Sequence, residues 1–348
     1  GIMRAVILKA FGGTENFQDG EWPEPSPTPS EVKIKAKAVS VNPTDYKARL
    51  GGNEGAVPII LGRDTAGIVE EVGENVDRFL PGDEVMAYLP RFGDSGGNGY
   101  AEFVCVPHEF VAKKPSNLSF EEAASIPLVS LTAYEAVSIK SKVAKNESVF
   151  VAGGSGGVGS MAVQMLRFFQ ADPLIVTAGS EESAVYLEEL GVEPDKIVLY
   201  SALSLDEVYE KVLSINNGKL PRVTCDFVGK DMKKLCMRLV DYLGRVVSIA
   251  PEEGAPIDNF FSSKTGPMYT KSASFHSVFL RSPVRGGGPN YYGVYMKSLE
   301  TIRNWLADEV LKPGKLDIIG LMNSENISRA HSILEEGHVK GKIVLVVE

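Results

Sequence analysis

A glycine-dense segment at residues 153–159 constrains the fold of this chain more than any other feature. The apolar run Val149–Ala152 before it is short enough for a buried strand, and the apolar residues after it recur at the spacing of a helix. Three of the glycines match the G-x-G-x-x-G pattern, which indicates dinucleotide binding when it joins a strand to a helix. A glycine turn with a purely structural role is the alternative. The residues predicted to bind a cofactor here are Gly154, Ser155, Gly156, Gly157, Val158 and Gly159.

Each glycine of the pattern has its own physical reason. Glycine at position 154 permits a tight turn, because no Cβ excludes unusual backbone angles. Gly156 lets a pyrophosphate approach the backbone, and Gly159 lets the helix pack closely on the strand. The N-terminus of the helix then offers free N–H groups and a partial positive charge to phosphate.

Composition limits the partners that this chain is expected to have. The net charge of -9 argues against nucleic acid and against an anionic membrane surface. The three cysteines lack paired spacing, which fits a reducing compartment, and no apolar run approaches the length of a membrane span. We therefore expect a cytoplasmic protein whose partner is a small molecule. A mitochondrial matrix location stays open if a presequence has been removed.

The pattern of predicted elements changes along the chain. The first 115 residues read as short strands separated by turns, as in a small β-barrel. From Glu147 onward strands and helices alternate, which predicts a parallel sheet with right-handed crossovers. The predicted fold class is therefore α/β.

Several motifs in one order resemble the medium-chain dehydrogenase/reductase family, specifically its zinc-free quinone oxidoreductase branch, which includes zeta-crystallin. The resemblance implies a GroES-like β-barrel catalytic domain over residues 1–126, completed by residues 286–348. Between these parts it implies an inserted Rossmann dinucleotide-binding domain, a doubly wound sheet, over residues 127–285, with the active site in the cleft between the two domains. It also implies a homodimer paired through an edge strand near residues 272–280, although a covered edge in a monomer would look the same. The motifs lie at residues 41–45, 62–67, 81–85, 100–103, 131–134 and 341–345.

Zinc is not expected in this chain. A catalytic zinc needs three protein ligands, and zinc-dependent relatives have a cysteine near position 42 and a histidine–glutamate pair after Gly62. Here those places hold Asn42, Arg63 and Asp64, and arginine cannot bind a metal because it stays protonated. We therefore predict that the chain has no metal-binding residues.

The expected cofactor is NADPH, with NADH as the alternative. An acidic residue after the second strand of the Rossmann sheet would hold the ribose hydroxyls of NAD and repel a 2′-phosphate. Gly179 and Ser180 occupy that place, and Tyr200 matches a family position that contacts the phosphate. Glu181 and Glu182 depart from this pattern, and either glutamate turned inward would favour NADH.

By resemblance, hydride passes from the cofactor to a quinone or another electrophilic carbonyl. The alternatives are an enoyl or 2-alkenal reductase and a non-catalytic NADPH-binding protein. Tyr46 is a candidate donor to the developing oxyanion, or else it only packs its helix. Arg63 forms either part of the substrate side or a structural ion pair with Asp64. The candidate catalytic residues are Tyr46, Asn42, Asp45 and Arg63, and the remaining cofactor residues are Thr132, Ile249, Phe279 and Lys342.

Two histidines near the C-terminus, His331 and His338, share one face of a predicted helix. We expect both of them to be exposed to solvent. Neither is expected to take part in the site.

Overall fold

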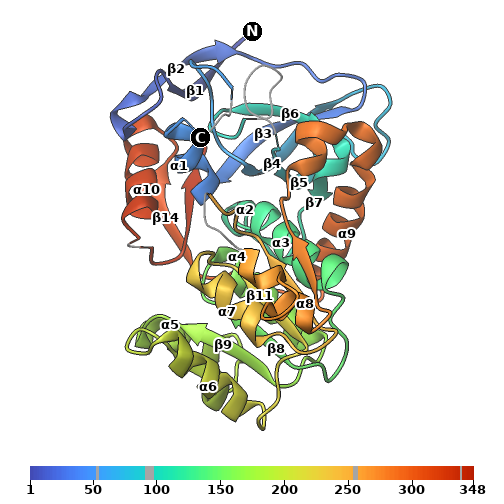
Figure 1. Cartoon of the computed structure of the whole chain (residues 1–348). Coiled ribbons are helices and arrows are strands. Elements are labelled where there is room, and N and C mark those ends of the chain that lie inside the picture. The colour runs from blue at the N-terminus through green and yellow to red at the C-terminus, as the bar shows by residue number, and fades with distance from the viewer. Residues whose placement is uncertain (52–54, 91–97, 254–257, 338) are drawn as a thin grey trace. The chain divides into compact units, whose positions relative to one another are not determined.

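The computed structural model describes residues 1–51, 55–90, 98–253, 258–337 and 339–348 (Figure 1). These residues divide into two compact units. The first unit contains Gly1–Leu131 and Arg281–Glu348, and the second contains Thr132–Leu280. Residues 91–99 are glycine-rich and polar, which predicts a loop, and most of this segment lies outside the described residues.

The first unit is built from antiparallel strands, with one strand contributed by the end of the chain. Its seven-stranded sheet has the order β14-β15-β3-β4-β5-β7, with β6 also paired to β3, and β1 and β2 form a separate hairpin. The predicted small β unit is thereby confirmed. Its strands are β1 (Ile2–Leu8), β2 (Phe17–Pro23), β3 (Glu31–Ser40), β4 (Asp64–Val72), β5 (Glu84–Tyr88), β6 (Phe103–Pro107), β7 (Val111–Lys113), β14 (Leu316–Leu321) and β15 (Lys342–Val346).

Helices of the first unit begin where local sequence signals predict them. Ser119 and Glu122 form both hydrogen bonds of a capping box at the start of α2. α2 ends at Ala124, and Pro127 is the first residue of α3, a position that suits proline because its missing N–H has no partner there. The helices are α1 (Pro43–Arg49), α2 (Phe120–Ala124), α3 (Pro127–Tyr134), α9 (Gly293–Ala307) and α10 (Ser324–Glu336), with short turns η1 (Thr14–Asn16), η2 (His108–Phe110), η6 (Pro283–Gly287) and η7 (Pro289–Tyr291).

The second unit contains one six-stranded parallel sheet with the order β10-β9-β8-β11-β12-β13. The order reverses between β8 and β11, which is the switch point of a Rossmann fold. The predicted doubly wound parallel sheet is thus confirmed. The strands are β8 (Val149–Ala152), β9 (Leu174–Ala178), β10 (Ile197–Leu199), β11 (Val223–Asp226), β12 (Arg245–Ser248) and β13 (Ser274–Ser277).

Helices cover both faces of this sheet, so its central strands are buried on both sides. One face packs on α6, α7 and α8 through a single apolar cluster, whereas α4 and α5 contact β8, β9 and β10 (Figure 1). The helical elements are η3 (Glu135–Lys140), α4 (Gly157–Phe168), α5 (Glu181–Glu189), η4 (Pro194–Lys196), α6 (Leu205–Ile215), α7 (Asp231–Leu239), η5 (Asp258–Phe261) and α8 (Pro267–Thr270).

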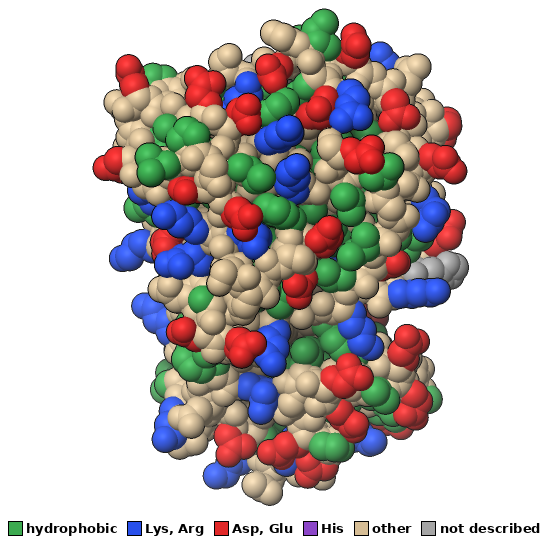
Figure 2. Space-filling view, turned by 180° about the vertical axis from the view of Figure 1, so that it is seen from behind, with side chains coloured by type: hydrophobic (Ala, Val, Ile, Leu, Met, Phe, Trp, Pro, Cys, Tyr) green, Lys and Arg blue, Asp and Glu red, His purple; other side chains and the backbone are tan. Residues whose placement is uncertain are grey.

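Charge on the surface is mixed. On the face drawn in Figure 2, acidic and basic side chains are interspersed among small apolar groups. Among the helices in the described parts of the chain, none combines the length and the apolar character that crossing a bilayer requires.

Candidate functional site

The glycine turn of the second unit has the geometry that the sequence predicts, but the roles of two glycines differ. Gly153, not Gly154, has the positive φ of +87° that the turn requires. Gly154 is needed for packing, because a Cβ there would lie 2.2 Å from Cγ1 of Val176. A Cβ on Gly159 would lie 1.9 Å from the carbonyl oxygen of Gly153, so this glycine allows the close packing of α4 on the turn.

The N-terminus of α4 is open to an anion. Gly156 is the N-cap residue, and no described side chain caps the helix there. A Cβ on Gly156 would have its nearest neighbour at 3.8 Å, and Gly156 and Gly157 are exposed. Uncapped N–H groups beside exposed backbone are what a pyrophosphate needs. These residues therefore fit a dinucleotide, and Ser155 and Val158 lie in the same turn.

Ser180 follows β9, the neighbour of β8, and Tyr200 follows β10, the next strand beyond it. Ser180 caps α5 by accepting a hydrogen bond from the Ser183 N–H at 3.1 Å, so its hydroxyl already has a structural role. A Cβ on Gly179 would lie 3.4 Å from the Tyr200 hydroxyl, which places Tyr200 next to this turn. Glu181, in the first turn of α5, is exposed. No acidic residue stands directly after β9.

The remaining cofactor candidates of the second unit lie at its edges. Ile249 directly follows β12 and is half-buried, and Phe279 lies two residues past β13 with 48% of its surface exposed. Thr132 is a buried residue of α3. The residues predicted after β8, β9, β10, β12 and β13 thus all lie at the carboxyl ends of parallel strands, where α/β sheets bind ligands.

A buried polar cluster in the first unit contains three other candidates. Asn42 and Asp45 belong to the N-terminal turn of α1, and Asp45 accepts a hydrogen bond from the Asn42 N–H at 2.9 Å. Asp45 also accepts from the Gly62 N–H at 3.1 Å. Lys342 of β15 donates to the side-chain oxygen of Asn42. The structure therefore places Lys342, predicted as a cofactor residue, among the predicted catalytic residues.

Asp64 is the second carboxylate of this cluster. It accepts hydrogen bonds from the Ser40 hydroxyl and the Asn42 amide, each at 2.9 Å, and from the Leu128 N–H at 2.9 Å. Its partners are therefore neutral donors, and the structural ion pair with Arg63 considered from the sequence is not what holds it.

Burial dominates the electrostatics of the cluster. It raises the pKa of Asp45 from 3.8 to about 6, although the Asn42 N–H and the charge of Arg63 lower it. Burial also raises the pKa of Asp64, against the lowering effect of the Lys342 charge. The pKa of Lys342 is lowered by burial, against the opposite effect of both carboxylates. The cluster thus holds a carboxyl that gains or loses a proton near neutral pH.

The other two catalytic candidates differ in their placement. Arg63 is buried and donates to the Pro90 carbonyl at 2.6 Å, while its charge acts on Asp45. Tyr46 of α1 is half-exposed, and within the described residues its hydroxyl makes no hydrogen bond to the cluster. Tyr46 is therefore not brought together with Asp45 in this structure.

A different tyrosine, Tyr100, is affected by the charge of Asp45. Tyr100 is fully buried, and burial together with the charge of Asp45 raises the pKa of the Tyr100 hydroxyl well above 10. His331 of α10 lies 3.1 Å from this hydroxyl and is also fully buried. The expectation that His331 is exposed is thus wrong, and His338 lies outside the described residues.

Metal-binding groups were sought throughout the described residues. No group of three or more His, Cys, Asp or Glu side chains there could hold a metal ion. At the places that correspond to zinc ligands in relatives, Asn42 and Asp64 are hydrogen-bonded to each other, and Arg63 is a cation. The absence of zinc stays a prediction.

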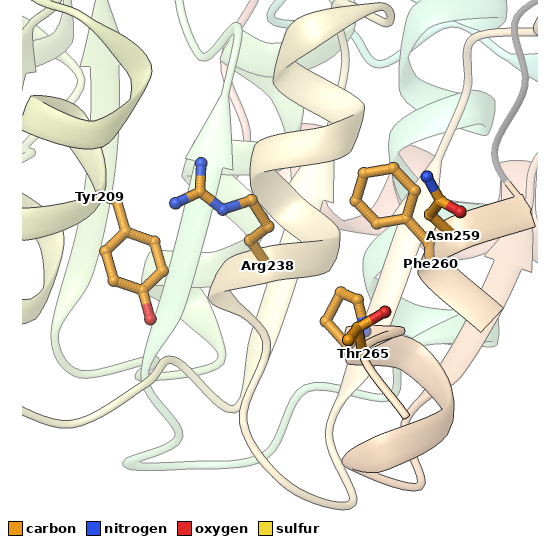
Figure 3. Close-up of a pocket in the computed structure, with 6 residues that line it drawn as sticks. Tyr209, Arg238, Asn259, Phe260 and Thr265 are labelled. Carbon is orange, nitrogen blue, oxygen red and sulfur yellow. The ribbon is translucent and has the colours of Figure 1, made fainter. Parts of the chain in front are cut away.

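One surface cavity of the second unit has a volume of about 630 Å³ (Figure 3). It is lined from α6, α7, η5 and α8, where the guanidinium of Arg238 lies over the ring of Tyr209 at 5.0 Å. None of its lining residues belongs to the glycine turn or to the polar cluster, so the cavity is separate from the candidate site. The lining residues are Tyr209, Arg238, Asn259, Phe260, Thr265 and Pro267.

Two family models match this chain. The alcohol dehydrogenase GroES-like domain matches residues 28–116, and the zinc-binding dehydrogenase model matches residues 157–290. An alcohol dehydrogenase superfamily protein from Novosphingobium aromaticivorans has the same fold with a TM-score of 0.85 and 26% identity, covering 99% of this chain and 100% of that one. The chain belongs to the medium-chain dehydrogenase/reductase superfamily. The expected pairing of a GroES-like domain with a Rossmann domain is confirmed.

Relatives within the superfamily carry several names. A quinone oxidoreductase of Pseudomonas syringae pv. Tomato DC3000 matches with a TM-score of 0.82 and 26% identity over 99% of both chains. The 2-methylene-furan-3-one reductase of Solanum lycopersicum is 28% identical over 312 residues, 88% of this chain and 69% of that one. The mitochondrial reticulon-4-interacting protein 1 of Caenorhabditis elegans is 41% identical over 140 residues, which span 39% of this chain and 37% of that protein.

The sequence analysis missed Tyr100, Ser40 and His331 as members of the polar cluster and its surroundings. For His331 the sequence did contain a signal, because helical spacing puts it on the same face as the apolar residues Ile327 and Ala330. The structure shows that this face is buried. Tyr100 was seen only as part of a family motif. No local signal indicates that its hydroxyl would meet His331 of α10.

Proposed function

We propose that this medium-chain dehydrogenase/reductase is a zinc-independent, NADPH-dependent reductase of quinones or similar electrophilic carbonyl compounds. The observation that supports it best is the buried cluster around Asp45, which offers a proton and positive charge from amino acids alone. A quinone that accepts a hydride also needs a proton, and a carboxyl with a pKa of about 6 can donate one near neutral pH.

The second unit would hold the cofactor. The N–H groups at the start of α4 would bind the pyrophosphate, while Ser180 and Tyr200 would meet the 2′-phosphate of NADPH. Bound NADPH would supply the hydride. The turn after β9 lacks an acidic residue, which favours NADPH over NADH because no carboxylate opposes the phosphate there.

In the first unit, Asp45 would supply the proton, and Lys342 and Arg63 would stabilise negative charge that develops on the acceptor oxygen. Asn42 would orient Lys342, because its side-chain oxygen accepts the lysine N–H. Tyr46 is half-exposed and free of the cluster, so it would contact substrate only if its side chain turns toward it.

An enone or enal is the second substrate class to consider, since the Solanum lycopersicum relative is named as a reductase of an enone. Such a substrate needs the same hydride and the same proton. The residues of the cluster do not distinguish quinones from enones and enals as substrates. The experiment must therefore distinguish them.

Stopped-flow oxidation of NADPH, and separately of NADH, tests the proposal. The acceptors are 1,4-benzoquinone, 9,10-phenanthrenequinone and an α,β-unsaturated aldehyde, with a simple alcohol and NADP⁺ as the reverse control. Turnover of NADPH with a quinone or an enal is expected. Tight NADPH binding without turnover of any acceptor would contradict the reductase and support a non-catalytic binding protein.

We also infer a homodimer that pairs through β13. This strand is the last in its sheet, and Ser274 and Ser277 at its ends are exposed. Light scattering on the protein and on a Phe275→Pro variant tests it, because proline removes a backbone donor from the edge. A monomeric wild-type protein would contradict the inference. The cytoplasmic location stays a prediction.

A further inference from the structure

A buried carboxylate outside the polar cluster, that of Asp226, lies at the carboxyl edge of the sheet in the second unit. Asp226 is the last residue of β11, the neighbour of β8 at the switch point, and it is fully buried. It accepts hydrogen bonds from the Val228 N–H at 3.0 Å and the Gly229 N–H at 2.7 Å. It also accepts from the Ser248 hydroxyl at 2.7 Å. One carboxylate therefore joins the turn after β11 to the end of β12.

The turn after β11 has a backbone that needs such support. Gly229 and Lys230 both have positive φ values, +92° and +55°. A non-glycine residue keeps a backbone angle of this kind only where the surrounding contacts determine it. The two N–H groups that Asp226 accepts from belong to Val228 and Gly229, directly before Lys230. The carboxylate thus holds the backbone beside its strained residue.

The chain after β12 packs against this turn. A Cβ on Gly229 would lie 2.8 Å from the Cβ of Ala250, so the two segments are in contact. Lys233 of α7, which is also buried, donates to the Ala250 carbonyl at 2.6 Å and forms an ion pair with Glu252 at 2.8 Å. Residues 226–230 and 248–252 therefore form one packed surface at the carboxyl edge, which we call the β11–β12 wall.

Val228 lies where the β11–β12 wall meets the glycine turn. A Cβ on Gly153 would lie 2.8 Å from Cγ2 of Val228, so the valine side chain lies directly against that turn. Even so, 52% of Val228 is exposed to solvent. Ligand sites are lined mainly by apolar side chains with a few polar groups among them. Val228 thus offers an apolar surface next to the N–H groups that would bind the pyrophosphate.

A dinucleotide lies across the switch point of a Rossmann sheet, with one half on each side. Under the proposed function, Ser180 and Tyr200 after β9 and β10 would meet the 2′-phosphate of the adenosine half. The nicotinamide half would then lie over β11 and β12. We propose that Val228 contacts the nicotinamide half of the cofactor and that Asp226 is the positioning residue that holds Val228 there. The inference rests on the proposed cofactor, but its first test needs no ligand.

The first test measures amide hydrogen exchange at Val228 and Gly229 by NMR of the ²H,¹⁵N-labelled protein without cofactor. Both N–H groups are expected to exchange slowly in the wild-type protein and at least about tenfold faster in Asp226→Ala, which lacks the acceptor. Asp226→Asn is the rescue variant, because its amide oxygen accepts from both N–H groups, and it is expected to keep the protection. Equal exchange in the wild-type protein and in Asp226→Ala would overturn the role of Asp226.

The second test compares two ligands by isothermal titration calorimetry, NADPH and adenosine 2′,5′-bisphosphate, which lacks the nicotinamide half. Val228→Ala is expected to raise the Kd for NADPH about three- to tenfold, because the apolar contact of both valine methyl groups is lost. Asp226→Ala is expected to raise it at least about tenfold. The Kd for the bisphosphate should stay unchanged in both variants. An equal loss for both ligands would mean that these residues only support the glycine turn, and it would overturn the contact.

Val185→Ala is the matched control, and it keeps the test decisive if Asp226→Ala does not fold. Val185 is 51% exposed, but it lies within α5 and not in a turn at the carboxyl edge. Both valine variants are expected to unfold at the wild-type urea concentration, and Val185→Ala should bind both ligands as the wild-type protein does. A rise in the Kd for NADPH as large in Val185→Ala as in Val228→Ala would overturn the contact.

Turnover separates this inference from the proposed reductase. If Val228→Ala weakens NADPH binding selectively and no acceptor is reduced, the reductase fails while the contact stands. If a quinone is reduced and Val228→Ala binds both ligands as the wild-type protein does, the contact fails alone. A wild-type protein that binds neither ligand would overturn both.

Discussion

The two candidate regions, the glycine turn of the second unit and the polar cluster of the first, are built by opposite means. At the edge of the second unit, the glycine turn offers backbone N–H groups and depends on the absence of side chains. A Cβ added at Gly159 would lie only 1.9 Å from the carbonyl oxygen of Gly153. In the first unit, the cluster around Asp45 works through charged side chains withdrawn from water. The first kind of site depends on local chain geometry, and the second depends on long-range packing.

This difference predicts different responses to mutation. The glycine turn is expected to lose cofactor binding when a side chain is added, because the turn has no room for one. A cluster of buried charges fails when a partner is removed, because the remaining charge loses its compensation. The predictions below use that contrast, beginning with the largest expected effect.

Gly159→Ala should abolish NADPH binding and destabilise the protein by about 3 kcal/mol or more, because its Cβ meets backbone that cannot move aside. Gly156→Ala is the matched control, since its nearest neighbour would lie at 3.8 Å. It should lower stability by no more than ~1 kcal/mol and weaken NADPH binding at least about tenfold. Chemical unfolding and fluorescence titration measure both. Equal stability of the two variants would contradict the packing role of Gly159.

Asp45→Asn should lower turnover by about 10²-fold or more, because an amide cannot donate a proton to the acceptor. In the wild-type protein, turnover should fall as pH rises through about 6, since the donor must be protonated. Steady-state rates between pH 5 and pH 9 test both statements. The exposed Asp77→Asn is the control and should change neither. A pH profile that survives in Asp45→Asn would exclude Asp45 as the donor.

The same raised pKa affects folding stability. The Asp45 pKa is about 6 in the folded protein and near 3.8 in the unfolded chain, so the folded state binds more protons between these values. Stability relative to Asp45→Asn is therefore fully present below pH 4 and falls by about 3 kcal/mol as pH rises through 6. Urea unfolding of both proteins at pH 4 to 8 measures the difference. A constant difference would contradict the burial effect.

Ser180→Asp should shift the preference from NADPH toward NADH by about 10- to 100-fold, because a carboxylate repels the 2′-phosphate. Ser180→Asn is the control, since aspartate and asparagine both cap a helix and only aspartate adds charge. The ratio of kcat/KM for the two cofactors is the measurement. A similar change in both variants would mean that the cap, and not the charge, matters.

Chelator treatment should have the smallest effect, namely none. The cluster supplies its positive charge from Lys342 and Arg63, so prolonged dialysis against a chelator should leave NADPH turnover unchanged. Metal analysis before and after dialysis accompanies the assay. Activity that is lost on dialysis and restored by Zn²⁺ would contradict a zinc-independent reaction.

Helices, strands and turns that are marked by a pattern of neighbouring residues could be predicted from the sequence. The fold class followed from these elements. The alternation of strands and helices from Glu147 onward correctly predicted a parallel sheet. The glycine turn was located correctly, although the positive φ falls on Gly153. These features depend on residues that are close together in the chain, so they can be read from a single sequence.

The polar cluster could be predicted only in part, because its contacts join distant segments. Lys342 meets Asn42 across 300 positions, and Arg49 meets His331 across 282. The pKa of Asp45 depends on burial that the surrounding sequence does not reveal. His331 was expected to be exposed, but it lies in the apolar stripe by which α10 packs on the first unit.

Single-turnover kinetics test the division of roles between the two regions most directly. NADPH oxidation by a quinone is followed in the wild-type protein, in Gly156→Ala and in Asp45→Asn. We expect Gly156→Ala to raise the Kd for NADPH at least about tenfold while the rate at saturation is preserved, and Asp45→Asn to keep the Kd while the rate falls by about 10²-fold. A weakened Kd with an unchanged rate in Asp45→Asn would contradict this account.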